Sequence, residues 1–225
     1  TGVQFLLDAV LDYLPSPLDI EYITGHNVEN QEILVKRRTL PSEPFTGLIF
    51  KIVNDSFFGK LAYCRVYSGK LATGSQVVNV NQNKKIKISK ILLMHANKRE
   101  EIKECIAGEI VALIINTKIF TGETLTASGA EILLEKMSFP ETVVALAVEA
   151  KTVADCDKLI AALEKLAEED PTLSLKINNE TGQAILYGMG ELHLEIIIDR
   201  LKREYNISVN VGKPSVTYKE TVSIK

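Results

Sequence analysis

The stretch of sequence that decides the fold is GMGELHLE, residues 188–195, together with the segment that follows it to residue 213. Its two glycines permit a tight turn at the end of an apolar strand. Glu191 then falls in the first turn of a helix, where unpaired N–H groups and the helix dipole favour a carboxylate. Apolar side chains recur after it at helical spacing and predict one buried face. The residues of that face are Leu194, Ile197, Ile198, Leu201 and Tyr205.

A second, narrower apolar stripe runs beside this face and consists of Leu192 and Ile196. A helix at the surface of a domain needs only one buried stripe. We therefore expect this helix to pack on its own sheet and to contact a second body through the narrower stripe.

The elements around this helix predict an α+β domain over residues 140–213. The expected elements are a strand over 143–150, a helix over 156–167, strands over 173–177 and 183–187, the helix that begins at Glu191, and a strand over 207–211. This βαββαβ order is that of the ferredoxin-like sandwich, with two helices on one face of an antiparallel sheet.

Residues 41–128 have the two-residue periodicity of β-strands, with frequent breaks at Gly, Asn or Asp. The expected strands cover 47–53, 61–68, 76–80, 85–94, 109–115 and 123–125. Many short strands at this spacing are typical of a closed antiparallel barrel. We therefore expect a multi-domain protein in which a β-barrel precedes the α+β sandwich.

The other segments precede or connect these domains. Residues 3–14 have the apolar spacing of a helix. Residues 19–43 are expected to form a connector with at most one short strand, over 33–35. Residues 129–139 are expected to be a linker, and residues 214–225 the start of a segment toward a further domain.

The composition is that of a soluble globular protein, with 46% hydrophobic and 24% charged residues. No apolar run approaches the roughly 18 residues of a membrane helix, and no signal peptide opens the chain. Cys64, Cys105 and Cys156 are widely spaced among apolar residues, so we expect buried thiols in a reducing compartment. These features predict a cytoplasmic protein without a membrane partner.

The net charge of −3 is unevenly distributed. Residues 41–128 carry twelve Lys and Arg against seven Asp and Glu, whereas residues 140–213 carry eight against thirteen. This asymmetry suggests that the first domain faces an anionic partner, although two solvated surfaces of different composition would give the same counts.

The expected strand over 85–94 provides a more specific indication. Lys85 and Lys87 alternate with Ile86 and Ile88, so this strand should bury its isoleucines and present its lysines outward. Such a face attracts phosphates without sequence specificity and suits RNA recognition through the backbone. The candidate RNA-binding residues are Lys84, Lys85, Lys87, Lys90, Lys98 and Arg99. Phe57 and Phe58 could stack on bases, but packing at the barrel end is the more frequent role and is expected here.

Motifs of catalysis are missing from the sequence. It lacks GxxxxGK[ST], GxGxxG, GxSxG and HExxH, and its three histidines lack metal-ligand spacing. The acidic run over 168–170 is expected to be a solvated helix end. His193 should either pack and hydrogen-bond within its domain or form a partner-facing row with Ile197 and Arg200. We therefore expect no catalytic, cofactor-binding or metal-binding residues in this chain.

Several motifs occur in the order found in one family. They are LLDAV (6–10), RVYSG (65–69), MHAN (94–97), LAEEDPT (166–172), GMGELHL (188–194) and NVGKP (210–214). With these motifs the chain resembles elongation factor G, the ribosomal translocase of the translational GTPase family, over essentially its whole length. The resemblance implies an internal fragment: the end of the GTPase domain over 1–40, the translation-factor barrel or domain II over 41–128, and domain III over 140–213.

The resemblance also implies partners and an activity. The intact parent would be a ribosome-dependent GTPase, active as a monomer, that promotes GTP-dependent translocation of tRNA and mRNA. GTP and Mg would bind in the missing GTPase domain. Domain II would contact small-subunit ribosomal RNA, and domain III would lie between the GTPase domain, a small-subunit ribosomal protein and RNA. The region of Glu191, His193, Ile197 and Arg200 resembles the segment that lines an interdomain antibiotic pocket.

Other functions stay open at this point. The family usually has GLKDTT before TGDTL, whereas this chain has INTKIF (115–120) before TGETL (121–125). The parent could therefore be a divergent paralogue or a ribosome-protection factor. A free-standing RNA-binding module is a further alternative. An acyl-phosphate hydrolase on the sandwich is disfavoured, because residues 151–154 after the first strand offer no Arg and no glycine-rich turn.

Overall fold

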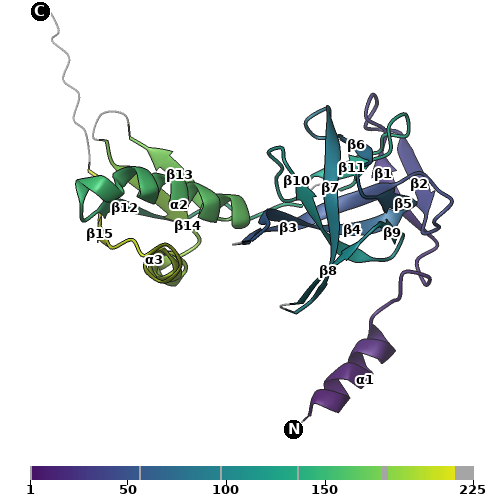
Figure 1. The fold of residues 1–225 in the computed structure, drawn as a ribbon, viewed down its shortest axis with the longest axis horizontal. Helices are drawn as coiled ribbons and strands as arrows, with labels where there is room; N and C mark the ends of the chain where they lie inside the picture. The colour runs from purple at the N-terminus through teal and green to yellow at the C-terminus, as the bar shows by residue number, and fades with distance from the viewer. Residues whose placement is uncertain (1, 56, 97, 136, 179–181, 216–225) are drawn as a thin grey trace, which may run out of the picture. The chain divides into compact units, whose positions relative to one another are not determined.

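The computed structural model describes residues 2–55, 57–96, 98–135, 137–178 and 182–215 (Figure 1). The chain divides into two compact units between Met137 and Ser138. Each unit has its own hydrophobic core. The fold class expected from the sequence, a β-barrel followed by a ferredoxin-like sandwich, is confirmed.

The first unit is built around an antiparallel barrel. Its strands are β3 (Thr46–Asp55), β4 (Gly59–Ser68), β6 (Gln76–Asn79), β7 (Lys84–His95), β8 (Lys98–Ile102), β10 (Ile110–Ile115) and β11 (Thr124–Thr126). Their order is β10-β4-β3-β11-β6-β7-β8, and β10 also pairs with β7, so the sheet closes on itself. Fully buried side chains fill the interior, among them Ile49, Ile52, Ile88, Leu113 and Leu125.

Strand β7 runs for 12 residues and pairs in turn with β6, β10 and β8. Its register against β10 shifts, because Ile115 pairs with Ile88 and Ile114 pairs with Lys90. This bulge adds one residue to β7. Ile88 and Ile91 therefore both reach the barrel core although they are an odd number of residues apart.

A small apolar cluster lies apart from the barrel core and includes Leu61, Leu92 and Ala112. Phe58 packs against this cluster, as expected for a ring at the barrel end. The same expectation is wrong for Phe57, whose residue surface is 84% exposed. The turn between β3 and β4 directs the two neighbouring rings to different environments.

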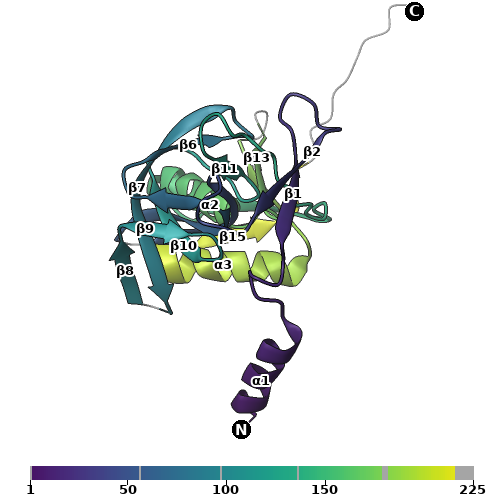
Figure 2. The ribbon, with the colours of Figure 1, turned by 90° about the vertical axis from the view of Figure 1, so that its right-hand side faces the viewer.

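The segments outside the expected barrel strands contain more structure than predicted. β1 (Tyr22–His26) pairs with β2 (Leu34–Arg38), and β5 (Lys70–Ala72) pairs with β9 (Glu104–Ile106). The expectation of at most one strand over 19–43 is therefore wrong. Figure 2 shows β1 and β2 side by side.

The β1–β2 hairpin is tied to the first part of the segment over 129–139. His26 and Leu133 exchange backbone hydrogen bonds of 2.7 and 2.9 Å, and Arg37 Nη2 donates to the Ala130 carbonyl at 2.9 Å. Ile132 is fully buried, and a side chain on Gly25 would approach it to 2.6 Å. The beginning of the expected linker is therefore a structured part of the first unit.

Helix α1 (Val3–Tyr13) forms where helical spacing predicts it, and none of its residues is buried. Its exposed apolar residues include Phe5, Leu6 and Leu11. Neither α1 nor any other helix in the described part of the chain combines the length and apolarity needed to cross a membrane.

The second unit has the expected βαββαβ order. Its elements are β12 (Val144–Ala150), a 3₁₀ turn (Val153–Asp155), α2 (Cys156–Glu169), β13 (Ser174–Ile177), β14 (Ala184–Gly188), α3 (Glu191–Tyr205) and β15 (Val209–Gly212). The sheet order is β13-β14-β12-β15 with antiparallel neighbours. Side chains of α2 and α3 share one core with the sheet, including Leu163, Leu166, Leu186, Leu194 and Ile197.

The three thiols lie in different environments. Cys64 and Cys105 are buried, and burial raises the pKa of Cys105 to about 12 and that of Cys64 as well. Cys156 is exposed at the start of α2, so the expectation of a buried thiol is wrong there. Cys156 is the first residue of α2, and the apolar residues around it in the sequence do not cover it there.

Candidate functional site

The first half of β7 presents Lys84, Lys85 and Lys87 to solvent, and we call these three residues the lysine face. Ile86 and Ile88 between and after them are buried at 3% and 0% exposure. Pairing with β6 fixes the register, with Lys85 opposite Val78. Within the part of the chain that the structure describes, no lysine of this face has an ion-pair partner. Their charges are therefore available to an external anion.

A loop after β10 adjoins the lysine face; the sequence marks it as a departure from the family pattern but not as part of this surface. Gln82, in the turn just before Lys84, donates a hydrogen bond of 3.2 Å to the carbonyl of Lys118. The Lys118 ammonium lies 5.4 Å from the centre of the Phe120 ring, within the range of a cation–π contact. The sequence gives no signal for this proximity, because the loop and the turn are far apart along the chain.

The carboxylate of Glu123 holds this loop in place. Glu123 is 7% exposed and accepts hydrogen bonds from Asn79 Nδ2 (2.8 Å), Gln82 Nε2 (2.8 Å) and the Phe120 N–H (2.9 Å). A buried carboxylate is costly unless such donors replace its water. Three neutral donors therefore fix the loop against the β6–β7 turn.

The other three barrel candidates lie in or beyond the second half of β7. Lys90 pairs with Glu101 at 2.7 Å, and Arg99 pairs with Asp55. Lys98 is exposed on β8, opposite His95. The predicted cationic edge is thus divided into an unpaired lysine face and a largely neutralised region.

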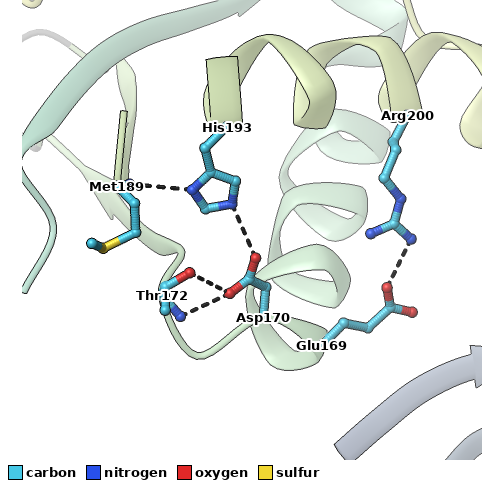
Figure 3. Close-up of polar contacts among 6 residues, drawn as sticks. All are labelled: Glu169, Asp170, Thr172, Met189, His193 and Arg200. Carbon is cyan, nitrogen blue, oxygen red and sulfur yellow. Dashed lines mark hydrogen bonds and ion pairs between the residues drawn. The ribbon is translucent and has the colours of Figure 1, made fainter. Parts of the chain in front are cut away.

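A second polar site joins the end of α2 to the start of α3 (Figure 3). The backbone N–H of Met189 donates to His193 Nδ1 at 3.2 Å. The ring proton therefore lies on Nε2, which donates to Asp170 Oδ2 at 3.0 Å. Asp170 Oδ1 accepts from the N–H and the hydroxyl of Thr172 at 2.9 and 2.6 Å. This chain of bonds fixes the turn between β14 and α3.

The charge of Asp170 is stabilised by these contacts. Burial alone would raise the pKa of its carboxyl. The hydrogen bonds from Thr172 and His193 outweigh that effect and keep the pKa below its usual value. Asp170 is therefore an ionised hydrogen-bond acceptor at neutral pH.

Arg200 makes a second connection between the two helices. It pairs with Glu204 on α3 at 2.8 Å and with Glu169 at the end of α2 at 2.8 Å. Its side chain is 27% exposed. The hydrogen bond to Glu204 is the main cause that raises its pKa, and Glu169 adds to it. Arg200 is therefore committed to contacts within its own unit.

The four candidates on α3 do not form one exposed row. Glu191 is exposed at the start of the helix, whereas His193 and Arg200 contact the end of α2. Ile197 is only 3% exposed and packs in the core, so its assignment to a partner-facing row or surface pocket is wrong. The solvent-facing stripe is instead Leu192 and Ile196, which are 70% and 50% exposed.

Comparison with known proteins identifies both units. Residues 44–128 match the family model of elongation factor G domain 2, and residues 139–213 match that of elongation factor G domain III. The chain belongs to the elongation factor G family. Its barrel is domain II, and its α+β unit is domain III, so the chain is part of a translation factor of this type.

A solved structure is similar to the chain over nearly its whole length. The crystal structure of a protein from Thermus thermophilus superposes on the chain with a TM-score of 0.69, and the two sequences are 28% identical. The match covers 96% of this chain and 30% of the other chain. The present chain thus spans less than one third of the length of that protein, 30% of it.

Proposed function

We propose that the chain is the ribosome-binding middle part of an elongation factor G-like GTPase that promotes GTP-dependent translocation of tRNA and mRNA. The observation that carries this proposal is the succession of domain II and domain III on one chain. GTP and Mg²⁺ would bind outside residues 1–225, because phosphoryl transfer needs a phosphate-binding loop and the sequence contains no such motif.

In this proposal the lysine face of domain II contacts ribosomal RNA. Its three exposed ammonium groups, to which the described residues offer no ion pair, can each replace a counterion at a phosphate. The buried Ile86 and Ile88 fix the strand beneath them, so the charges are held by a rigid barrel. Domain II would thus supply an anchor of low sequence specificity.

Domain III would relay a conformational change between its partners rather than catalyse a reaction. Its exposed stripe of Leu192 and Ile196 lies on a helix whose start is fixed by His193 and Asp170. We propose this stripe as the contact with the GTPase domain of the same protein. Because linkers between domains usually permit rearrangement, nucleotide state could be relayed through this helix to the ribosome.

Substitution of the lysine face tests this function. In the intact protein, Lys84→Ala, Lys85→Ala and Lys87→Ala together should weaken ribosome binding and lower the slope of log K against log salt by roughly two. Lys151→Ala, Lys202→Ala and Lys213→Ala in domain III remove the same charge from exposed positions and serve as the control. An unchanged salt slope in the first variant would contradict the proposed anchor.

A further inference from the structure

The turn between β3 and β4 holds an aromatic ring in solvent. Phe57 is 84% exposed, yet its backbone N–H is bound by Asp55 Oδ1 at 2.8 Å. The same oxygen accepts the N–H of Phe58 at 3.0 Å, and the Asp55 side chain is only 8% exposed. Phe58 packs inward against the small apolar cluster. The backbone at Phe57 is thus held by Asp55, and the next residue is anchored in the apolar cluster.

A cation from the next hairpin completes this arrangement. Arg99 on β8 pairs with Asp55 Oδ2 and lies 5.9 Å from the centre of the Phe57 ring. That separation is within the range of a cation–π contact. The ion pair therefore joins two hairpins and keeps a guanidinium beside the ring.

The surroundings of Phe57 indicate which partner it fits. Among the described residues 53–62 and 93–100, it is the only exposed large hydrophobic side chain. The exposed residues of the β7–β8 hairpin that carries Arg99 include the polar His95, Lys98 and Glu100. A protein-docking site would usually have a wider apolar patch around its anchor. A single exposed ring beside a guanidinium instead fits a surface on which a nucleobase stacks.

We propose that Phe57 is a stacking platform for an unpaired base of RNA, with the guanidinium of Arg99 beside the ring. Arg99 pairs opposite Met94 near the end of β7, whereas the lysine face lies at the start of that strand, so the platform and the lysine face are separate sites. This inference extends the proposed function, since both take RNA as the partner, but it rests on different residues and on stacking instead of charge.

The absence of Trp from the chain allows a direct test. Phe57→Trp introduces a single indole at the platform. Titration with an adenosine RNA oligomer of about ten nucleotides should quench its fluorescence saturably. Inorganic polyphosphate, which has charge but no bases, should leave the fluorescence unchanged. An unquenched indole in a chain that binds the oligomer by fluorescence anisotropy would overturn the platform.

Matched variants separate stacking from apolarity and from charge. Phe57→Tyr should bind the labelled oligomer as the wild type does, whereas Phe57→Leu should bind about tenfold more weakly. Equal affinity of the leucine variant would overturn the platform and favour a protein contact.

Adding Lys84→Ala, Lys85→Ala and Lys87→Ala to Phe57→Trp should lower the salt slope of oligomer binding without changing the quenching at saturation. An unchanged slope with normal quenching would contradict only the lysine face, and no oligomer binding at all would contradict both.

Discussion

Glu123 illustrates how individual residues position the candidate surface. Its carboxylate is buried and accepts hydrogen bonds from Asn79, Gln82 and the backbone of Phe120. The loop that contains Phe120 is therefore fastened next to the lysine face. Sequence reasoning could not find this role, because Asn79 is 44 residues from Glu123 along the chain.

Glu123→Gln should lower the free energy of unfolding of domain II by about 1–3 kcal/mol. A glutamine has only one acceptor oxygen. Its NH₂ group would face one of the three donors, which would leave at least that donor without an acceptor. Urea unfolding of the chain measures this change. Glu101→Gln breaks an exposed pair with Lys90 and should cost less than about 1 kcal/mol. Equal stability of the two variants would contradict the proposed role of Glu123.

Asp170 gives a prediction that depends on pH. Its pKa lies below the usual 3.8, so its ionised form stabilises the folded state above that pH. The contribution is lost as the pH falls through the lowered pKa of the folded state. Asp170→Asn should therefore destabilise domain III at neutral pH, and the difference from wild type should shrink below about pH 3.8. Urea midpoints measured from neutral pH down to strongly acidic pH test this, and a difference independent of pH would contradict it.

At the scale of elements, the periodic segments were predictable and the short ones were not. The alternation of Lys85 and Lys87 with isoleucines placed the lysine face correctly on the outside of β7. β5 and β9 are three residues long and pair through Leu71 and Cys105, so no local pattern identifies them. The ion pair of Arg99 with Asp55 likewise depends on contact between two hairpins. Local periodicity predicts exposure, but not which charged residues of different hairpins form ion pairs.

Helix α3 allows a test of the two stripes that the sequence distinguishes. Ile197→Ala removes a core side chain and should cost about 2–5 kcal/mol of unfolding free energy. Leu192→Ser, at a position that is 70% exposed, should change it by less than about 0.5 kcal/mol. Chemical unfolding of domain III measures both. If the two substitutions were equally destabilising, the assignment of Leu192 to a free contact surface would be wrong.

At the scale of the whole molecule, the chain consists of two domains with separate cores. The segment between them begins as part of the barrel unit, where His26 and Leu133 pair and Ile132 is buried. The hydrogen bonds of Glu123 hold the loop beside the lysine face, and those of Asp170 fix the start of α3, which carries Leu192 and Ile196. In the proposed function both domains would serve binding, and the nucleotide chemistry would belong to the GTPase domain.

The 225-residue chain should accordingly bind neither GTP nor GDP. Its sequence has no phosphate-binding loop motif, on which P-loop GTPases depend. Isothermal titration calorimetry with each nucleotide and Mg²⁺ should give no binding heat at micromolar concentrations. A micromolar dissociation constant would show that the chain contains a nucleotide site of its own.

The contact between the lysine face and ribosomal RNA is the central claim, and directed cleavage tests it most directly. The intact protein would carry Lys85→Cys with an attached iron chelate, in a background where exposed Cys156 and any other reactive thiols are replaced by Ser. We predict cleavage of small-subunit ribosomal RNA at sites that differ from those given by the same probe at Lys158→Cys in domain III. A ribosome-bound protein that produces no cleavage from the position of Lys85 would contradict the claim.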